Sequence, residues 1–137
     1  PVASIRLFEN ILAIGMGIEP EICSFKDRCG SYVVVEYNGD VYPCDFFVEE
    51  HWLLGNLLET PLQDLMRKRR RRDFNNRKME PSSGCKTCEW NVFCHYGCQH
   101  YRSALGENVL CEAYREFFRY TGRRFGVLKE NCRKGHS

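Results

Sequence analysis

The sequence contains no run of about 18 apolar residues, which excludes an ordinary transmembrane helix. Its most apolar segment, residues 11–18, is too short to span a bilayer, and the charged residues Arg6 and Glu9 precede it. A basic-then-apolar signal peptide is missing as well. A glycine-rich phosphate loop and a G-x-S-x-G nucleophile elbow are also absent. The sequence has no initiating methionine either, so we expect it to be part of a longer protein.

The composition is that of a folded chain with a small net charge. Of 137 residues, 43% are hydrophobic and 28% are charged, which excludes wholesale disorder. Twenty basic residues against 18 acidic ones leave a net charge of +2. The length predicts one domain, or one domain plus a fragment of another.

Cysteine is the unusual residue in this chain. Nine cysteines are present, an odd number, in a chain without a secretory signal. Small secreted proteins with disulfide frameworks usually have an even number. We therefore expect reduced, metal-binding thiolates and a cytoplasmic location rather than a disulfide scaffold. The nine are Cys23, Cys29, Cys44, Cys85, Cys88, Cys94, Cys98, Cys111 and Cys132.

A β-hairpin is predicted upstream of the dense cysteine segment. Residues 32–37 are rich in β-branched and aromatic side chains, and Asn38 and Gly39 separate them from residues 40–42. An Asn-Gly pair between such runs is typical of a type I′ turn, because both residues tolerate positive φ.

Helices are predicted on both sides of the dense cysteine segment. Thr60, Pro61 and Gln63 resemble a cap, a first-position proline and a capping-box residue, so a helix should begin near Thr60. We expect it to continue into the arginine-rich run at residues 67–72. A last helix is predicted over residues 112–120, with an aromatic side that favours a place in the core.

The cysteine spacing is a strong metal signal. Cys85-x2-Cys88-x5-Cys94-x3-Cys98 has the short intervals that let thiolates face one centre. Such sites serve zinc and iron–sulfur clusters alike. A zinc ribbon would normally offer two short pairs per metal, whereas the intervals here are irregular. This irregularity favours cubane clusters and leaves zinc open. Cys132 is left over as a free thiol with no assigned role.

Seven cysteines and one glycine of this sequence resemble the SPASM domain, which is appended to radical S-adenosylmethionine enzymes that modify peptides and proteins. The matching positions are Cys29, Gly39, Cys44, Cys85, Cys88, Cys94, Cys98 and Cys111. The additional Cys23, and Asp45 directly after Cys44, resemble the anaerobic sulfatase-maturating enzymes, which oxidise a sulfatase Cys or Ser to formylglycine.

This resemblance implies two auxiliary [4Fe–4S] clusters with four cysteine ligands each. Because all eight ligands would come from the chain, we expect structural and electron-transfer roles rather than direct binding of substrate sulfur. The first implied set is Cys23, Cys29, Cys44 and Cys98. The second implied set is Cys85, Cys88, Cys94 and Cys111.

Asp45 is the expected catalytic residue. In the family that the sequence resembles, the matching aspartate is proposed to take a proton from the target Cys or Ser. The residue alone favours a turn-capping role after Pro43 and Cys44. Both roles stay open at this point.

The radical-generating motif of such enzymes, C-x3-C-x2-C, is absent, because Tyr101 follows Cys98 where a third cysteine would be needed. We therefore expect an inactive C-terminal part whose missing barrel binds S-adenosylmethionine. An apparent strand at residues 4–7 and a helix at residues 8–16 are interpreted as the end of that partial (β/α) barrel.

The predicted fold is irregular α+β, with a small hairpin, two or three helices and long cysteine-bearing loops. Residues 1–20 are expected to belong to the barrel, residues 21–125 to the cluster domain and residues 126–137 to a C-terminal tail. The expected partners are the barrel and a sulfatase polypeptide, without membrane or nucleic acid.

Two alternatives remain. One is a SPASM domain of another peptide-modifying enzyme. The other is a zinc module that contacts nucleic acid or protein through residues 67–72, although a net charge of only +2 favours a solvated helix end for this run.

Overall fold

The computed structural model describes residues 3–134, without the side chains of residue 129 and residues 131–134. The chain divides into two compact units. One unit combines the residues up to Asp27 with those from Pro81 onward, and the other unit is Arg28–Glu80. Short strands, several helices and long irregular segments alternate along the chain, which confirms the predicted irregular α+β class.

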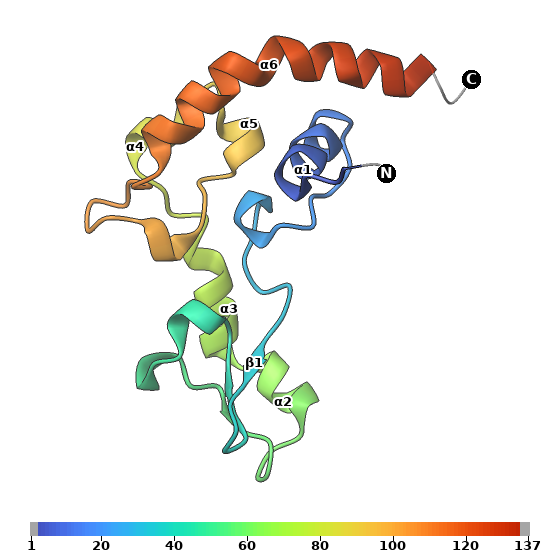
Figure 1. The fold of residues 1–137 in the computed structure, drawn as a ribbon. Helices are drawn as coiled ribbons and strands as arrows, with labels where there is room; N and C mark the ends of the chain where they lie inside the picture. The colour runs from blue at the N-terminus through green and yellow to red at the C-terminus, as the bar shows by residue number, and fades with distance from the viewer. Residues whose placement is uncertain (1–2, 135–137) are drawn as a thin grey trace. The chain divides into compact units, whose positions relative to one another are not determined.

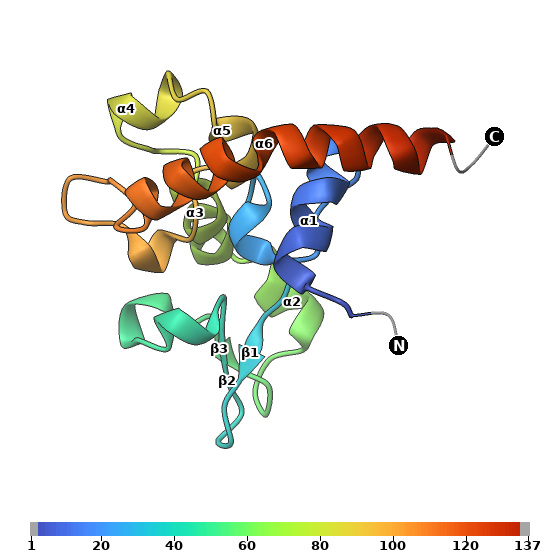
Figure 2. The same ribbon diagram turned by 45° about the horizontal axis from the view of Figure 1, so that its top comes forward.

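The unit Arg28–Glu80 contains a three-stranded antiparallel sheet with strand order β1-β2-β3 (Figure 2). The predicted hairpin is confirmed as β1 and β2, in which Val35 pairs with Val41. The third strand is an addition that the sequence did not predict, and it pairs Gly55 with Val41. The strands are β1 (Val34–Val35), β2 (Asp40–Tyr42) and β3 (Gly55–Asn56).

The hairpin turn differs from the predicted type I′ turn. Gly39 has a φ of 89°, whereas Asn38 is not among the described residues with positive φ. The Glu36 amide donates to the Asp40 carbonyl at 2.8 Å, and the Gly39 amide donates to the Glu36 carbonyl at 2.9 Å. This is a three-residue loop in which only the last position is left-handed, so a single glycine suffices.

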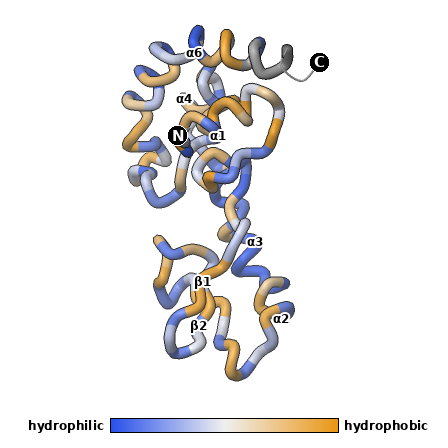
Figure 3. Tube along the Cα trace, turned by 45° about the vertical axis from the view of Figure 1, so that its right-hand side comes forward, coloured by the Kyte–Doolittle hydropathy of each residue, from blue (hydrophilic) through white to orange (hydrophobic). Residues whose placement is uncertain are grey.

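Two helices follow the sheet where one was predicted. They are α2 (Leu62–Arg67) and α3 (Arg69–Arg77). Lys68 separates them with an extended ψ of 142°, so the helix does not continue through the arginine-rich run. The cap position of α2 is Pro61 rather than Thr60, and no side chain caps it. In Figure 3 the trace of α3 is mostly hydrophilic.

The core of this unit is small and aliphatic. Val41, Leu54 and Leu65 are at most 1% exposed and form one cluster. An aromatic group extends it, in which the Phe74 ring lies 5.1 Å from the rings of both Phe47 and Trp52. Residues of α2 and of the loop before β3 thus pack on Val41 of the sheet.

The other unit is helical (Figure 1). Its α-helices are α1 (Arg6–Gly15), α4 (Ser83–Lys86), α5 (Asn91–Cys94) and α6 (Cys111–Lys134), with 3-10 helices η1 (Cys23–Phe25) and η4 (Gln99–Tyr101). The predicted strand at residues 4–7 is wrong, because α1 begins at Arg6 and only Ile5 is extended as its cap. The prediction of two or three helices is too low for the described residues.

Aromatic side chains of α6 form the core of the helical unit. Phe118 is 2% exposed, and its ring lies 5.8 Å from Trp90, 5.4 Å from Phe93 and 6.0 Å from Tyr114. This confirms the predicted place of the aromatic side in the core. Helix α6 is much longer than predicted and continues through the expected tail to Lys134. No described helix is long and apolar enough to cross a membrane.

Candidate metal centre

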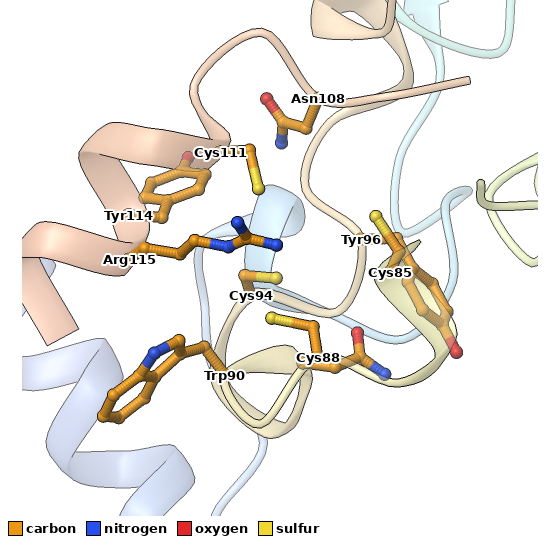
Figure 4. A pocket seen from close by; sticks show the side chains of 10 residues that line it. Cys85, Cys88, Trp90, Cys94, Tyr96, Asn108, Cys111, Tyr114 and Arg115 are labelled. Carbon is orange, nitrogen blue, oxygen red and sulfur yellow. The ribbon is translucent and has the colours of Figure 1, made fainter. Parts of the chain in front are cut away.

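Four cysteines line one pocket in the helical unit (Figure 4). They reach it from three separate helical segments, since Cys85 lies in α4, Cys94 ends α5 and Cys111 begins α6. Cys88 lies between α4 and α5. These are the four members of the second implied ligand set, so the fold brings together residues up to 26 positions apart.

The chain turns sharply between Cys94 and Cys98. His95, Tyr96 and Gly97 have successive φ values of 43°, 66° and 65°. A Cβ atom at position 97 would overlap Nδ2 of Asn108, so only glycine fits there. The left-handed run leaves Cys94 in the pocket, whereas Cys98 is described by the structure but is not among the lining residues. Two cysteines four positions apart therefore diverge.

Asn108 connects the start of α6 with the pocket. Its Oδ1 accepts a hydrogen bond from the Leu110 amide at 2.9 Å, and its carbonyl accepts one from the Cys111 amide at 3.0 Å. The residue is 7% exposed, and its Nδ2 group has no hydrogen-bond partner. A buried amide donor at a sulfur-lined pocket can donate to a ligand that accepts hydrogen bonds.

Arg115 lies one helical turn after Cys111, and in Figure 4 its guanidinium group extends among the cysteine side chains. Its pKa is raised by the charges of Cys111 and Cys88 and by a hydrogen bond to Cys88. On its other side it contacts Oε1 of Glu112 at 3.2 Å. Arg115 is the only basic residue among the described residues that line the pocket.

Burial disfavours the ionised form of two of these thiols. It raises the pKa values of Cys94 and Cys111, and in Cys111 the nearby positive charge of Arg115 acts in the opposite direction. Thiolates are the form that binds metal, so loading the pocket would release protons and provide the free energy that ionises the buried sulfurs.

The donor set fits an iron–sulfur cluster. Four thiolates are the usual ligands of [4Fe–4S] centres, and N–H donors near the sulfurs tune them. Within the described part of the chain, no group of three or more His, Cys, Asp or Glu side chains is arranged to hold a metal ion. A single tetrahedral zinc would need sulfurs only about 3.8 Å apart, and a cluster holds its ligands farther apart. The pocket thus suits a cluster better than a lone ion.

The other implied set is divided between the two units. Cys23 lies in η1 and Cys98 caps η4 in the helical unit, whereas Cys29 and Cys44 belong to the sheet unit. All four are partly buried. Cys132 lies in α6, but its side chain is outside the described residues.

Asp45 follows β2 and begins the 3-10 helix η2 (Asp45–Phe47). Its Oδ1 accepts a hydrogen bond from the Tyr32 hydroxyl at 2.5 Å. The same hydroxyl lies 3.5 Å from Sγ of Cys44, and that sulfur lies 3.4 Å from Oδ1 of Asp45. Tyr32, Cys44 and Asp45 thus form a closed group at the end of the hairpin.

Electrostatics within this group keep Asp45 ionised. The Tyr32 hydrogen bond is the main cause that lowers the pKa of Asp45. Burial, followed by the Asp45 hydrogen bond, raises the pKa of Tyr32, so the tyrosine remains a neutral donor. Burial also raises the pKa of Cys44. At neutral pH the carboxylate can accept a proton, and the tyrosine holds it in one orientation.

The arginine-rich run is more than a solvated helix end. Nη2 of Arg71 donates to the Gly30 carbonyl at 2.7 Å, and Nη1 of Arg70 donates to the Leu53 carbonyl at 2.5 Å. Arg69 instead is 86% exposed. At least two of these side chains therefore connect segments of the sheet unit, which corrects the expectation for the run as a whole.

Residues 23–89 match the family model of SPASM, an iron–sulfur cluster-binding domain. This part of the chain is similar to the SPASM domain. The match includes Cys23, Cys29, Cys44, Cys85 and Cys88 and ends before the later cysteines. The predicted extent of the SPASM domain, residues 21–125, is longer than this match and stays a prediction.

Two curated relatives are similar to nearly the whole chain. The cysteine-type anaerobic sulfatase-maturating enzyme of Clostridium perfringens is 34% identical over 135 residues, which are 95% of this chain and 36% of the relative. The serine-type anaerobic sulfatase-maturating enzyme of Bacteroides thetaiotaomicron is 33% identical over 133 residues, which are 92% of this chain and 32% of the relative. The chain thus spans about a third of the length of these enzymes.

A solved structure is similar as well. Native anSMEcpe with bound AdoMet and Cp18Cys peptide matches with a TM-score of 0.88 at 32% identity, over 95% of this chain and 37% of that chain. The short sheet, the helices and the long irregular segments are therefore similar to those of part of a solved structure.

Three residues around the cysteines were missed by the sequence analysis. Arg115 had a usable signal, because a basic residue four positions after a helical cysteine lies on the same face. Asn108 had one too, since an asparagine side chain often accepts a hydrogen bond from the backbone amide two positions on. Tyr32 had none, because it lies 13 positions before Asp45 in the sequence.

Proposed function

We propose that this chain is the auxiliary cluster part of an anaerobic sulfatase-maturating enzyme, which oxidises a Cys or Ser of a sulfatase polypeptide to formylglycine. The observation that carries the proposal is the convergence of Cys85, Cys88, Cys94 and Cys111 on one pocket of a chain that is similar to the SPASM domain. The similarity to relatives that are sulfatase-maturating enzymes supports the substrate class. Because the cysteine-type and serine-type relatives are about equally similar, the proposal covers both target residues.

The domain would hold two [4Fe–4S] clusters. We assign Cys85, Cys88, Cys94 and Cys111 to one and Cys23, Cys29, Cys44 and Cys98 to the other. The pocket supports the first assignment, and the sequence pattern supports the second. When bound, such clusters stabilise the fold and can accept electrons. In protein prepared in air, zinc can occupy the thiolates in place of iron.

Asp45 would act as the general base. Its carboxylate would take the proton of the target thiol or hydroxyl at the oxygen that Tyr32 leaves open. The hydrogen bond from Tyr32 supports this role, because it keeps the carboxylate ionised and oriented. S-adenosylmethionine would bind in a barrel that precedes this part of the enzyme, and this chain alone would be inactive. We place the longer enzyme in the cytoplasm.

The first test is the metal content of the chain after anaerobic reconstitution. We expect about eight iron and eight sulfide per chain. Cys85→Ala should lose about half of the iron, whereas Cys132→Ala, a cysteine outside both ligand sets, should lose none. Two zinc ions without stable iron under the same conditions would overturn the assignment of clusters.

The second test uses the longer enzyme. We expect Asp45→Asn to lower formylglycine formation at least 100-fold with iron content unchanged. The control Asp64→Asn removes an exposed carboxylate of the same unit and should leave the rate unchanged. A fully active Asp45→Asn enzyme would show that Asp45 only caps its turn.

A further inference from the structure

Arg115 is placed to act on whatever the four cysteines bind. It lies on α6 one turn after Cys111, lines the pocket and forms a hydrogen bond to Cys88. Figure 4 shows its guanidinium group between the side chains of Cys111, Cys94 and Cys88. Through the hydrogen bond to Cys88, Arg115 contacts at least one of the four sulfurs directly.

The charges of the lining residues indicate how Arg115 can act on a bound cluster. The four cysteines would bring negative charge as thiolates, and Arg115 is the only cation among the described lining residues. Glu112 pairs with Arg115 at 3.2 Å on the exposed side of the helix, which fixes the guanidinium group but weakens its field. The Arg115 side chain is 40% exposed, so solvent screens part of its charge.

Asn108 is a second hydrogen-bond donor at this pocket. Nδ2 of Asn108 is buried and unpartnered at the same pocket. Reduction potentials of iron–sulfur clusters depend on net charge, on hydrogen bonds to sulfur and on exposure to solvent. A positive charge and N–H donors both favour the reduced, more negative cluster.

We propose that Arg115 raises the reduction potential of the cluster held by Cys85, Cys88, Cys94 and Cys111, with Asn108 as a second, neutral donor. The inference rests on the proposed function, because it requires that this pocket holds a cluster. It adds a residue that tunes the cluster without being one of its ligands.

The test is a redox titration of the loaded chain with dithionite, followed by electron paramagnetic resonance. We compare Arg115→Gln with Arg119→Gln, which removes the same charge one turn farther along α6 at an exposed position. In Arg115→Gln, the ratio of reduced to oxidised cluster at a fixed potential should fall about tenfold for one of the two spectral components. For a one-electron couple that corresponds to a shift of about 59 mV to more negative values. Arg119→Gln should shift neither component.

The outcomes separate the two proposals. Wild-type chain without iron overturns the proposed function and this inference with it. Loaded Arg115→Gln with unchanged potentials overturns only the role of Arg115. If Arg115→Gln fails to bind iron, Arg115→Lys decides, because it keeps the charge. A loaded Lys variant that stays within about threefold of wild type supports the charge argument, and one that falls tenfold overturns it.

Discussion

The hydroxyl of Tyr32 lies 2.5 Å from Oδ1 of Asp45 and 3.5 Å from Sγ of Cys44. A phenol has a single hydrogen to donate, and the short distance assigns it to the carboxylate. Tyr32 therefore orients the proposed base, whose Oδ1 also lies 3.4 Å from Sγ of Cys44. The hairpin provides this geometry, because it returns the chain from Tyr32 to Cys44 and Asp45.

Replacing Tyr32 by Phe removes this hydrogen bond with little change in shape. In the longer enzyme we expect the rate of formylglycine formation to fall about tenfold, the equivalent of one ordinary hydrogen bond. Iron content should stay unchanged, since no ligand is lost. The matched control is Tyr37→Phe in the hairpin turn, where the side chain is fully exposed and no loss is expected.

The pH dependence of this variant distinguishes orientation from ionisation. The Tyr32 hydrogen bond lowers the pKa of Asp45 below its ordinary value of 3.8. Without the bond the pKa rises toward that value, which is still far below neutral pH, so the carboxylate stays ionised. The loss of rate should therefore be the same at pH 7 and pH 8. A rate that recovers as the pH rises contradicts a role in orientation.

Gly97 is predicted to be irreplaceable in the cysteine loop. Gly97→Ala would require a left-handed alanine whose Cβ atom overlaps Asn108. We expect the free energy of unfolding to fall by about 1–3 kcal/mol and the iron content of the Cys85, Cys88, Cys94 and Cys111 site to fall with it. Gly84→Ala is the control, because no atom lies within 4 Å of its added Cβ. Equal stability of the two variants would exclude strain at Gly97.

Phe118 should be the most sensitive aromatic residue of the helical unit. It is 2% exposed and contacts rings from four other positions, so Phe118→Ala should lower the free energy of unfolding by about 3–5 kcal/mol. Tyr120→Ala, at a residue that is 68% exposed, should change it by about 0.5 kcal/mol or less. Anaerobic thermal unfolding of the loaded chain measures both. A smaller effect at Phe118 than at Tyr120 would contradict the assignment of the core.

Arg71 is expected to stabilise the sheet unit rather than to bind nucleic acid. Arg71→Gln loses the bond to the Gly30 carbonyl and should cost about 1–3 kcal/mol of unfolding free energy. Arg69→Gln removes an exposed charge that lies 3.5 Å from Asp73 and should cost about 0.5 kcal/mol or less. Denaturant titration gives both values. Unchanged stability together with salt-dependent DNA or RNA binding in the wild type would instead support a nucleic-acid surface.

Much of the candidate site could be predicted from local sequence. The intervals between Cys85, Cys88 and Cys94 indicated a metal site, and Asn38-Gly39 indicated the hairpin. The secondary-structure predictions were wrong where packing between distant segments outweighed the local preference for a strand or a helix. The alternating residues 4–7 predicted a strand, but the chain is helical from Arg6 because Phe8 packs on Phe117 and Phe125 of α6. The arginine-rich run predicted a continuous helix, but Lys68 is extended between α2 and α3.

The sequence alone predicts a metal site and the hairpin that precedes Asp45. Both predictions depend on residues that are neighbours in the chain, namely the closely spaced cysteines and the turn residues. The folded chain was needed to show that Cys94 and Cys98 diverge, that Arg115 faces the sulfurs, and that Tyr32 holds Asp45. Such contacts join residues 13 or even 41 positions apart. Their formation depends on the path of the whole chain and on the burial that stabilises it, and no local pattern encodes that path.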